Sequence, residues 1–172
     1  MTLTPSQTVG PFFALGLREA PRLVAAGEPG AVRLEGVVYD GAGDPVPDAV
    51  VEIWQADRGL WGRCCTDAGG RYGFLTVKPG AYPWANHDNA WRPAHIHLSL
   101  FGPAFATRLV TQMYFPGDPL FDQDPIFQSV RDPRARERLI SSFDLERTVP
   151  EWALAYRFDV VLRGREATPM EA

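Results

Sequence analysis

The sequence is poor in the residues that define several classes of protein. It carries 2 cysteines and 3 histidines among 172 residues, and its formal net charge is -4. So few cysteines exclude a disulfide framework, and the acidic balance gives no basic field for nucleic acid or an anionic membrane. No apolar run approaches the roughly 20 residues that span a bilayer, and the N-terminus lacks the pattern of a signal peptide. We therefore expect a cytoplasmic protein with no nucleic-acid or membrane partner.

Glycine and proline, by contrast, are plentiful, with 16 of each. Both residues disfavour long helices, because glycine costs entropy when it is ordered and proline lacks a backbone donor. Asp132 and Pro133 suit the cap and the first position of one short helix at about 132–142. The other runs are short and either alternating or rich in β-formers. They are residues 32–39, 49–55, 71–77, 94–101, 107–115 and 153–162. These runs predict an all-β fold, an antiparallel β-sandwich with one short helix.

The composition indicates one folded domain that covers residues 1–172. Its hydrophobic fraction of 45% and aromatic fraction of 12% are typical of a globular protein. We find no internal repeat and no low-complexity linker that would mark a second domain. Within the domain we expect an N-terminal arm at 1–30 and a β-sandwich core at 31–172.

The most informative segment is WRPAHIHLSL, residues 91–100. Side chains two apart on a strand lie on the same face, so His95 and His97 can point at one metal ion. The HxH pattern is a weak signal by itself. A pair of core histidines that are satisfied by hydrogen bonds would produce the same pattern.

A tyrosine lies a short way upstream, in PGAYPWANHDNAW, residues 79–91. Prolines on both sides restrict the backbone around Tyr82, so this segment can present a phenol at low ordering cost. A bound cation stabilises the phenolate form of tyrosine. One phenolate and two imidazoles suit ferric iron, and they lack both the thiolates of structural zinc and the carboxylate of ferrous oxygenases. Alone, Tyr82 would also be an ordinary amphipathic turn residue.

Three stretches together resemble the intradiol catechol dioxygenases: GAYPWANHDNAWRPAHIHLSLFG, RLVTQMYFPGDPLFDQDPI and YRFDVVLRG. Within that family the sequence is most similar to the iron-binding β-type subunits of protocatechuate 3,4-dioxygenases. The N-terminal TPSQTVGPF is more similar to their α subunits. The resemblance covers nearly the whole chain. It implies a non-heme Fe(III) enzyme that cleaves a catechol with O2, and a homo- or hetero-oligomer.

Carried over by position, the resemblance implies a metal site made of Tyr82, His95 and His97. It implies that Arg92 stabilises the reacting form of the substrate and that Gln112 lies near the oxygen-binding side. It also implies that Trp84 lines the substrate pocket. Gly10 and Pro11 of the N-terminal segment are implied to lie close to bound substrate.

The sequence departs from the family at one position. The family has a second tyrosine ligand on a long segment between two strands. Here the corresponding stretch, EIWQADRGLWGRCC, is short and contains no tyrosine. The substrate proton that this ligand would accept then needs another acceptor, such as hydroxide or a nearby base; His87 is conceivable, although a surface histidine fits better. We expect a dioxygenase whose metal has three protein ligands. Two alternatives are an impaired or non-catalytic partner subunit and a carrier with a vestigial metal site.

Overall fold

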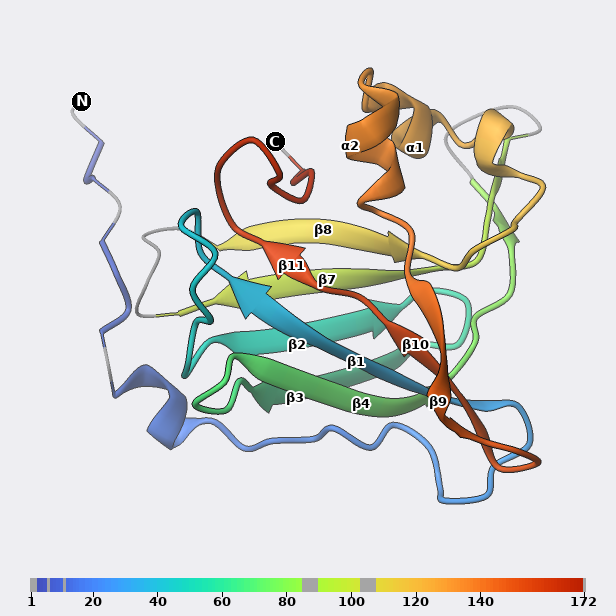
Figure 1. Cartoon of the computed structure of the whole chain (residues 1–172), viewed down its shortest axis with the longest axis horizontal. Coiled ribbons are helices and arrows are strands. Elements are labelled where there is room, and N and C mark those ends of the chain that lie inside the picture. The colour runs from blue at the N-terminus through green and yellow to red at the C-terminus, as the bar shows by residue number, and fades with distance from the viewer. Residues whose placement is uncertain (1–2, 6, 11, 85–89, 103–107, 172) are drawn as a thin grey trace.

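Two packed β-sheets form the body of the chain in a computed structural model that describes residues 3–5, 7–10, 12–84, 90–102 and 108–171 (Figure 1). The first sheet has the order β11 (Val160–Val161), β1 (Ala31–Tyr39), β10 (Ala153–Arg157), β9 (Ser142–Val149), and β4 (Arg71–Val77) also pairs with β1. The second sheet has the order β3 (Leu60–Cys65), β2 (Val50–Gln55), β7 (His95–Phe101), β8 (Leu109–Tyr114). A small ladder joins β5 (Tyr82–Pro83) to β6 (Trp91–Arg92).

The all-β sandwich is confirmed, with one refinement to its strand directions. The second sheet is antiparallel throughout, whereas β1 pairs in parallel with both β10 and β11. The strand β9 was not predicted, because it is an edge strand with mostly exposed side chains and therefore shows no clear alternation.

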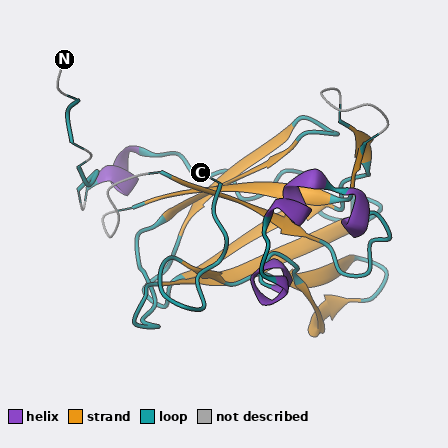
Figure 2. Cartoon of the chain, turned by 90° about the horizontal axis from the view of Figure 1, so that it is seen from above, coloured by secondary structure: helices purple, strands orange, loops and turns teal. Residues whose placement is uncertain are grey.

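The helices are short; the two α-helices lie on one side of the sandwich, whereas a 3-10 turn lies apart from them near the N-terminus (Figure 2). The predicted helix exists as α2 (Pro133–Glu137), and the side chain of Asp132 caps its Arg134 amide. Its predicted end at about 142 was wrong, because β9 begins at Ser142. A second helix, α1 (Pro125–Ser129), was not predicted, although Asp124 caps it in the same way. Two 3-10 turns, η1 (Phe13–Gly16) and η2 (Phe121–Gln123), complete the helical elements of the described residues. No helix in that part of the chain is long and apolar enough to cross a membrane.

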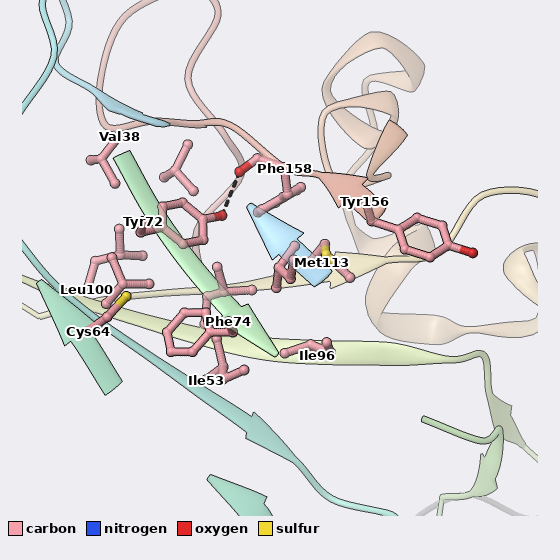
Figure 3. Packing of buried hydrophobic residues seen from close by; sticks show 14 of the residues in the cluster. Val38, Ile53, Cys64, Tyr72, Phe74, Ile96, Leu100, Met113, Tyr156 and Phe158 are labelled. Carbon is pink, nitrogen blue, oxygen red and sulfur yellow. Dashed lines mark hydrogen bonds between the residues drawn. The ribbon is translucent and has the colours of Figure 1, made fainter. Parts of the chain in front are cut away.

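The core lies between the two sheets and follows the alternation of their strands (Figure 3). On β2, Val51 and Ile53 are buried in this core, while Trp54 is 43% exposed on the opposite face. Tyr72 lies at one end of the core and donates its buried hydroxyl to the carbonyl of Phe158 at 2.5 Å. Because one face of each strand is used for the core, the outer face of the second sheet is free to carry a site.

The N-terminal segment behaves as two parts. Ala20 exchanges backbone hydrogen bonds with Arg63 on β3, and the amide of Leu23 donates to Leu75 on β4. The earlier part extends away from the body (Figure 1), and Phe12 and Leu15 are 77% and 82% exposed. Part of the expected arm is therefore paired with the sandwich before residue 30.

Candidate metal centre

The outer face of β7 carries the two histidines. Ile96, Leu98 and Leu100 belong to the core, so His95 and His97 point the other way. On the neighbouring strand β8, Tyr114 lies opposite His95 and Gln112 lies opposite His97. The strand register thus gathers four polar side chains on one patch of the sheet.

The β5–β6 ladder brings Tyr82 to this patch. Its phenol oxygen lies 3.1 Å from Nε2 of His95, and Nε2 of His95 lies 3.2 Å from Nε2 of His97. The segment before Tyr82 is fixed because the Gly80 amide donates to Asp57 at 2.8 Å. Three candidate ligand atoms from two separate ladders therefore converge.

The spacing of these three atoms fits a shared metal ion. Ligand atoms that each lie about 2.1 Å from one ion are roughly 3 Å apart when they are at right angles. In the described part of the chain, no three His, Cys, Asp or Glu side chains form a group that could hold a metal ion. The phenol of Tyr82 is therefore needed to complete a three-residue site around His95 and His97.

The histidine protonation states also suit a metal. Nδ1 of His95 lies 2.7 Å from the carbonyl oxygen of Pro93, which can only accept, so Nδ1 carries the proton and Nε2 offers a lone pair. Burial lowers the pKa of His95 from 6.5 to about 3, and the Arg92 charge lowers it too. Burial likewise lowers the pKa of His97. Both rings are neutral at pH 7, as metal binding requires.

Without a cation, Tyr82 is a neutral phenol. Burial raises the pKa of Tyr82, the charge of Arg92 opposes this, and Asp124 and Asp57 raise it further. A cation bound between Tyr82 and the histidines would reverse the balance, because it stabilises the phenolate more than the phenol.

Arg92 is buried beside the three candidate ligands, at 4% exposure. Its Nη2 donates to Oε1 of Gln112 and, at 3.0 Å, to the hydroxyl of Tyr114. Its Nε lies 2.9 Å from Oδ1 of Asp124, but this N–H has no aligned acceptor, so the contact is an ion pair without a hydrogen bond. The guanidinium also lies 6.0 Å from the ring centre of Trp84. Arg92 is thus held in one orientation by several neighbours.

A pocket of about 630 Å³ opens onto this group, a size typical of small-molecule sites. Arg92, His97 and Gln112 line it, whereas Tyr82 and His95 do not, so the pocket meets the candidate ligands from the His97 side. Its remaining walls come from β8, from the α1 region and from the C-terminal segment: Thr111, Tyr114, Ile126, Ser129, Val130, Leu139, Pro169, Met170 and Glu171.

The structure does not bring Gly10 to this group. Phe13 donates its amide to the Gly10 carbonyl, and the ring of Phe13 lies 6.3 Å from that of Phe101, at the far end of β7 from His95. A strand of this length places its ends roughly 20 Å apart. Pro11 and His87, which the sequence also singled out, lie outside the described residues.

Sequence reasoning missed three side chains of the site. Tyr114 is buried, and its hydroxyl belongs to the polar patch and donates to Asp124 at 2.9 Å. The period-two spacing of Gln112 and Tyr114 was a usable signal, since it matches that of the two histidines. Asp124 and Glu171 carry no such pattern.

The position of the family's second tyrosine ligand is a tight turn here. The strand β2 ends at Gln55 and β3 begins at Leu60, and Gly59 has a positive φ of 62°. A positive φ strongly favours glycine and closes the hairpin without an inserted segment. The shortened stretch seen in the sequence is therefore a compact hairpin, with no room for a long ligand-bearing loop.

Comparison with known proteins decides the family. A family model described as "Dioxygenase" matches residues 17–164. The protocatechuate 3,4-dioxygenase beta chain of Burkholderia cepacia is 55% identical in an alignment that covers 86% of this chain and 72% of that protein. The chain belongs to the intradiol dioxygenase family.

Two further comparisons extend this assignment. This dioxygenase is 33% identical to the protocatechuate 3,4-dioxygenase alpha chain of Pseudomonas putida, over 96% of this chain and 94% of that one. The solved dioxygenase domain of a carbohydrate-binding fusion from Streptomyces sp. SirexAA-E is 29% identical, with a TM-score of 0.67 over 94% of this chain and 98% of that one. The chain is thus similar to both kinds of subunit, with higher identity to the beta chain.

Proposed function

We propose that the chain is a non-heme Fe(III) intradiol dioxygenase that cleaves protocatechuate or a related catechol with O2. The observation that carries this proposal is the convergence of three atoms, the Tyr82 oxygen and the Nε2 atoms of His95 and His97, with neighbouring separations of 3.1 and 3.2 Å. They meet beside a pocket that Arg92 and Gln112 also line. This donor set matches the hard, partly anionic ligands that ferric iron prefers.

The reaction inserts both atoms of O2 between the two hydroxylated ring carbons. The bond between these carbons breaks, and the product is a cis,cis-muconate-type diacid. When bound, ferric iron supplies a Lewis acid and a template for the two catechol oxygens. Tyr82, His95 and His97 would hold the ion, and because His97 alone of these three lines the pocket, the substrate would approach from that side.

The buried residues around the ion have complementary roles. Arg92, itself 4% exposed, places a fixed positive charge where electron density builds up on the ring. Gln112 holds that guanidinium through its amide oxygen, and Trp84 flanks it at 6.0 Å. Asp124 pairs with Arg92 and so limits its net charge. Arg92 would therefore act chiefly as a directed donor to a substrate oxygen.

The proposal is tested on aerobically purified full-length protein by metal analysis, a visible spectrum and turnover assays. We expect stoichiometric iron, a charge-transfer band from tyrosinate to Fe(III), and ring cleavage of protocatechuate, catechol or hydroxyquinol. Consumption of O2 and formation of a diacid would be followed together. A protein that takes up iron yet cleaves none of the three substrates would overturn the proposal.

The shortened β2–β3 hairpin favours a second candidate, a non-catalytic or impaired partner subunit of a protocatechuate 3,4-dioxygenase complex. The segment that carries the family's second tyrosine is absent between Gln55 and Leu60. Co-expression with a ligand-complete subunit separates the two candidates. Activity that appears only in the mixed complex, and survives Tyr82→Phe in this chain, would favour the partner role.

We also propose that the chain works as an oligomer in which the N-terminal arm of one copy reaches the pocket of another. Gly10 is hydrogen-bonded to Phe13, whose ring lies 6.3 Å from that of Phe101 at the far end of β7 from His95, so Gly10 does not contact its own site. The arm also exposes Phe12 and Leu15, which are apolar and would gain stability from burial against a second copy. In this arrangement Gly10 and Pro11 contact the substrate of the neighbouring copy.

A further inference from the structure

The amide of Gln112 has only one orientation that satisfies its neighbours. Its oxygen accepts from Nη2 of Arg92 and lies 3.0 Å from the hydroxyl oxygen of Tyr114, whose single proton is donated to Asp124. Its nitrogen donates to Oε1 of Glu171 at 2.5 Å. A guanidinium can only donate and a carboxylate can only accept, so a flipped amide would break the contacts at both ends.

Glu171 is held in place by the backbone of the C-terminal segment. Its own amide donates to the Val110 carbonyl at 2.7 Å, and the hydroxyl of Thr111 donates to the Pro169 carbonyl at 2.6 Å. Thr168, at 3% exposure, is anchored to β11 through two hydrogen bonds with Val161, at 2.9 and 3.0 Å. The segment therefore runs beside β8 in a defined register and presents one carboxylate to the pocket.

We propose that Glu171 is a positioning residue for Gln112. The carboxylate fixes the nitrogen end of the amide, which keeps the amide oxygen on Arg92 and keeps the N–H groups from turning toward His97 and the pocket. This hydrogen bond is charge-assisted, because its acceptor is a carboxylate, and is therefore stronger than a bond between neutral groups. The acceptor belongs to a segment that is distant in sequence from every other site residue. The effect on catalysis rests on the proposed function, whereas the orientation of the amide does not.

The first experiment needs neither iron nor activity. In metal-free protein labelled with 15N, the side-chain amide protons of Gln112 are assigned by comparison with Gln112→Ala. We expect Glu171→Ala to shift these two signals and to speed their exchange with water, because the carboxylate acceptor is gone. Glu166→Ala is the matched control, since Glu166 lies in the same segment but pairs with Arg138 at 3.4 Å. Signals that are unchanged in Glu171→Ala would overturn the proposal.

The second experiment is a double-mutant cycle on the iron-loaded enzyme. We expect Glu171→Ala to lower kcat/KM for a catechol about 10-fold, the scale of one charged hydrogen bond. Glu171→Gln should recover part of the loss, because its amide oxygen can still accept. In the Gln112→Ala background, Glu171→Ala should have less than about a twofold effect, since its target is missing.

The outcomes separate the two proposals. A full 10-fold loss in the Gln112→Ala background would mean that Glu171 acts by another route, and would overturn the positioning role. If iron-loaded wild-type protein cleaves no catechol, the proposed function fails, and the amide signals still decide the role of Glu171.

Discussion

The phenol oxygen of Tyr82 lies 3.1 Å from Nε2 of His95, although the two residues belong to different β-ladders. The ladders meet because β6 and β7 are joined by the short turn Pro93–Ala94, whose Pro93 carbonyl also accepts from His95. The same turn thus fixes both the position of His95 and the ring nitrogen that carries its proton. A metal site that depends on this contact should fail when the phenol is removed.

Tyr82→Phe should abolish the tyrosinate-to-iron band and weaken iron binding. Loss of a group that only supports a ligand costs 10- to 100-fold in metal affinity, so loss of a ligand should cost at least about 100-fold. Absorption spectroscopy and a competition titration with a chelator measure the two effects. Tyr156→Phe is the control, since Tyr156 lies on β10 of the first sheet, not on the sheet that carries the histidines, and packs against Phe115 and Phe143. A Tyr82→Phe protein that keeps its colour would show that another tyrosine is the ligand.

The buried histidines should make the metal-free protein less stable in acid. The pKa of His95 is about 3 in the folded chain against an ordinary 6.5, so between these values the unfolded chain binds a proton that the folded chain does not. The free energy of unfolding therefore decreases as the pH falls from 6.5 toward 3. From pH 6.5 to 5.0 the loss due to His95 should be about 1.5 kcal/mol.

Urea unfolding of metal-free wild type and His95→Gln at both pH values checks this expectation. The variant should show a smaller drop, by about that same amount, whatever its absolute stability. Equal drops in the two proteins would mean that His95 is not held neutral by burial.

The sequence predicted the sandwich and the shared face of two histidines because both follow from local periodicity, whereas the choice of Tyr82 as a third ligand rested on the resemblance to the family. His95 and His97 are two apart on a strand, and their shared face needs no knowledge of distant contacts. A buried amide in an apolar strand needs hydrogen-bond partners, and those of Gln112 are Arg92 and Glu171.

The remaining features depend on contacts that no local pattern encodes. Asp124 precedes a proline just as Asp132 does, so the sequence predicts a helix cap at both positions equally well. Only the fold buries Asp124 completely and leaves Asp132 exposed. Glu171 lies in a segment without strand or helix periodicity, and its bond to Gln112 spans 59 positions. The distance of Gly10 from its own pocket also follows from the tertiary path of the arm.

Asp124 should matter far more to stability than its exposed counterpart. Its carboxylate is 0% exposed, lies 2.9 Å from Nε of Arg92, accepts from Tyr114 at 2.9 Å and caps the Ile126 amide at 2.9 Å. Asp124→Ala leaves a buried guanidinium without its anion, which should cost about 3–5 kcal/mol. Asp132→Ala removes only a surface cap and should cost about 1 kcal/mol.

Chemical denaturation of the two variants gives the comparison directly. Losses of similar size would mean that the Arg92–Asp124 pair contributes little beyond the helix cap. If Asp124→Ala does not fold, Asp124→Asn retains the shape and the bond accepted from the Ile126 amide, and its loss should lie between the two values.

The arm offers a test that depends on exchange between chains. A chain lacking residues 1–16 keeps its metal ligands, and Tyr82→Phe keeps its arm, so each should be poorly active alone. Co-expressed, they should form mixed assemblies in which the Tyr82→Phe copy lends its arm to the intact site of its neighbour. Random pairing into dimers makes half of them mixed, each with one complete site, so about a quarter of wild-type activity should return.

Co-expression of Tyr82→Phe with His97→Ala is the control, because each site is then defective within its own chain. Full activity of the shortened chain by itself would show that Gly10 and Pro11 are not needed at any pocket.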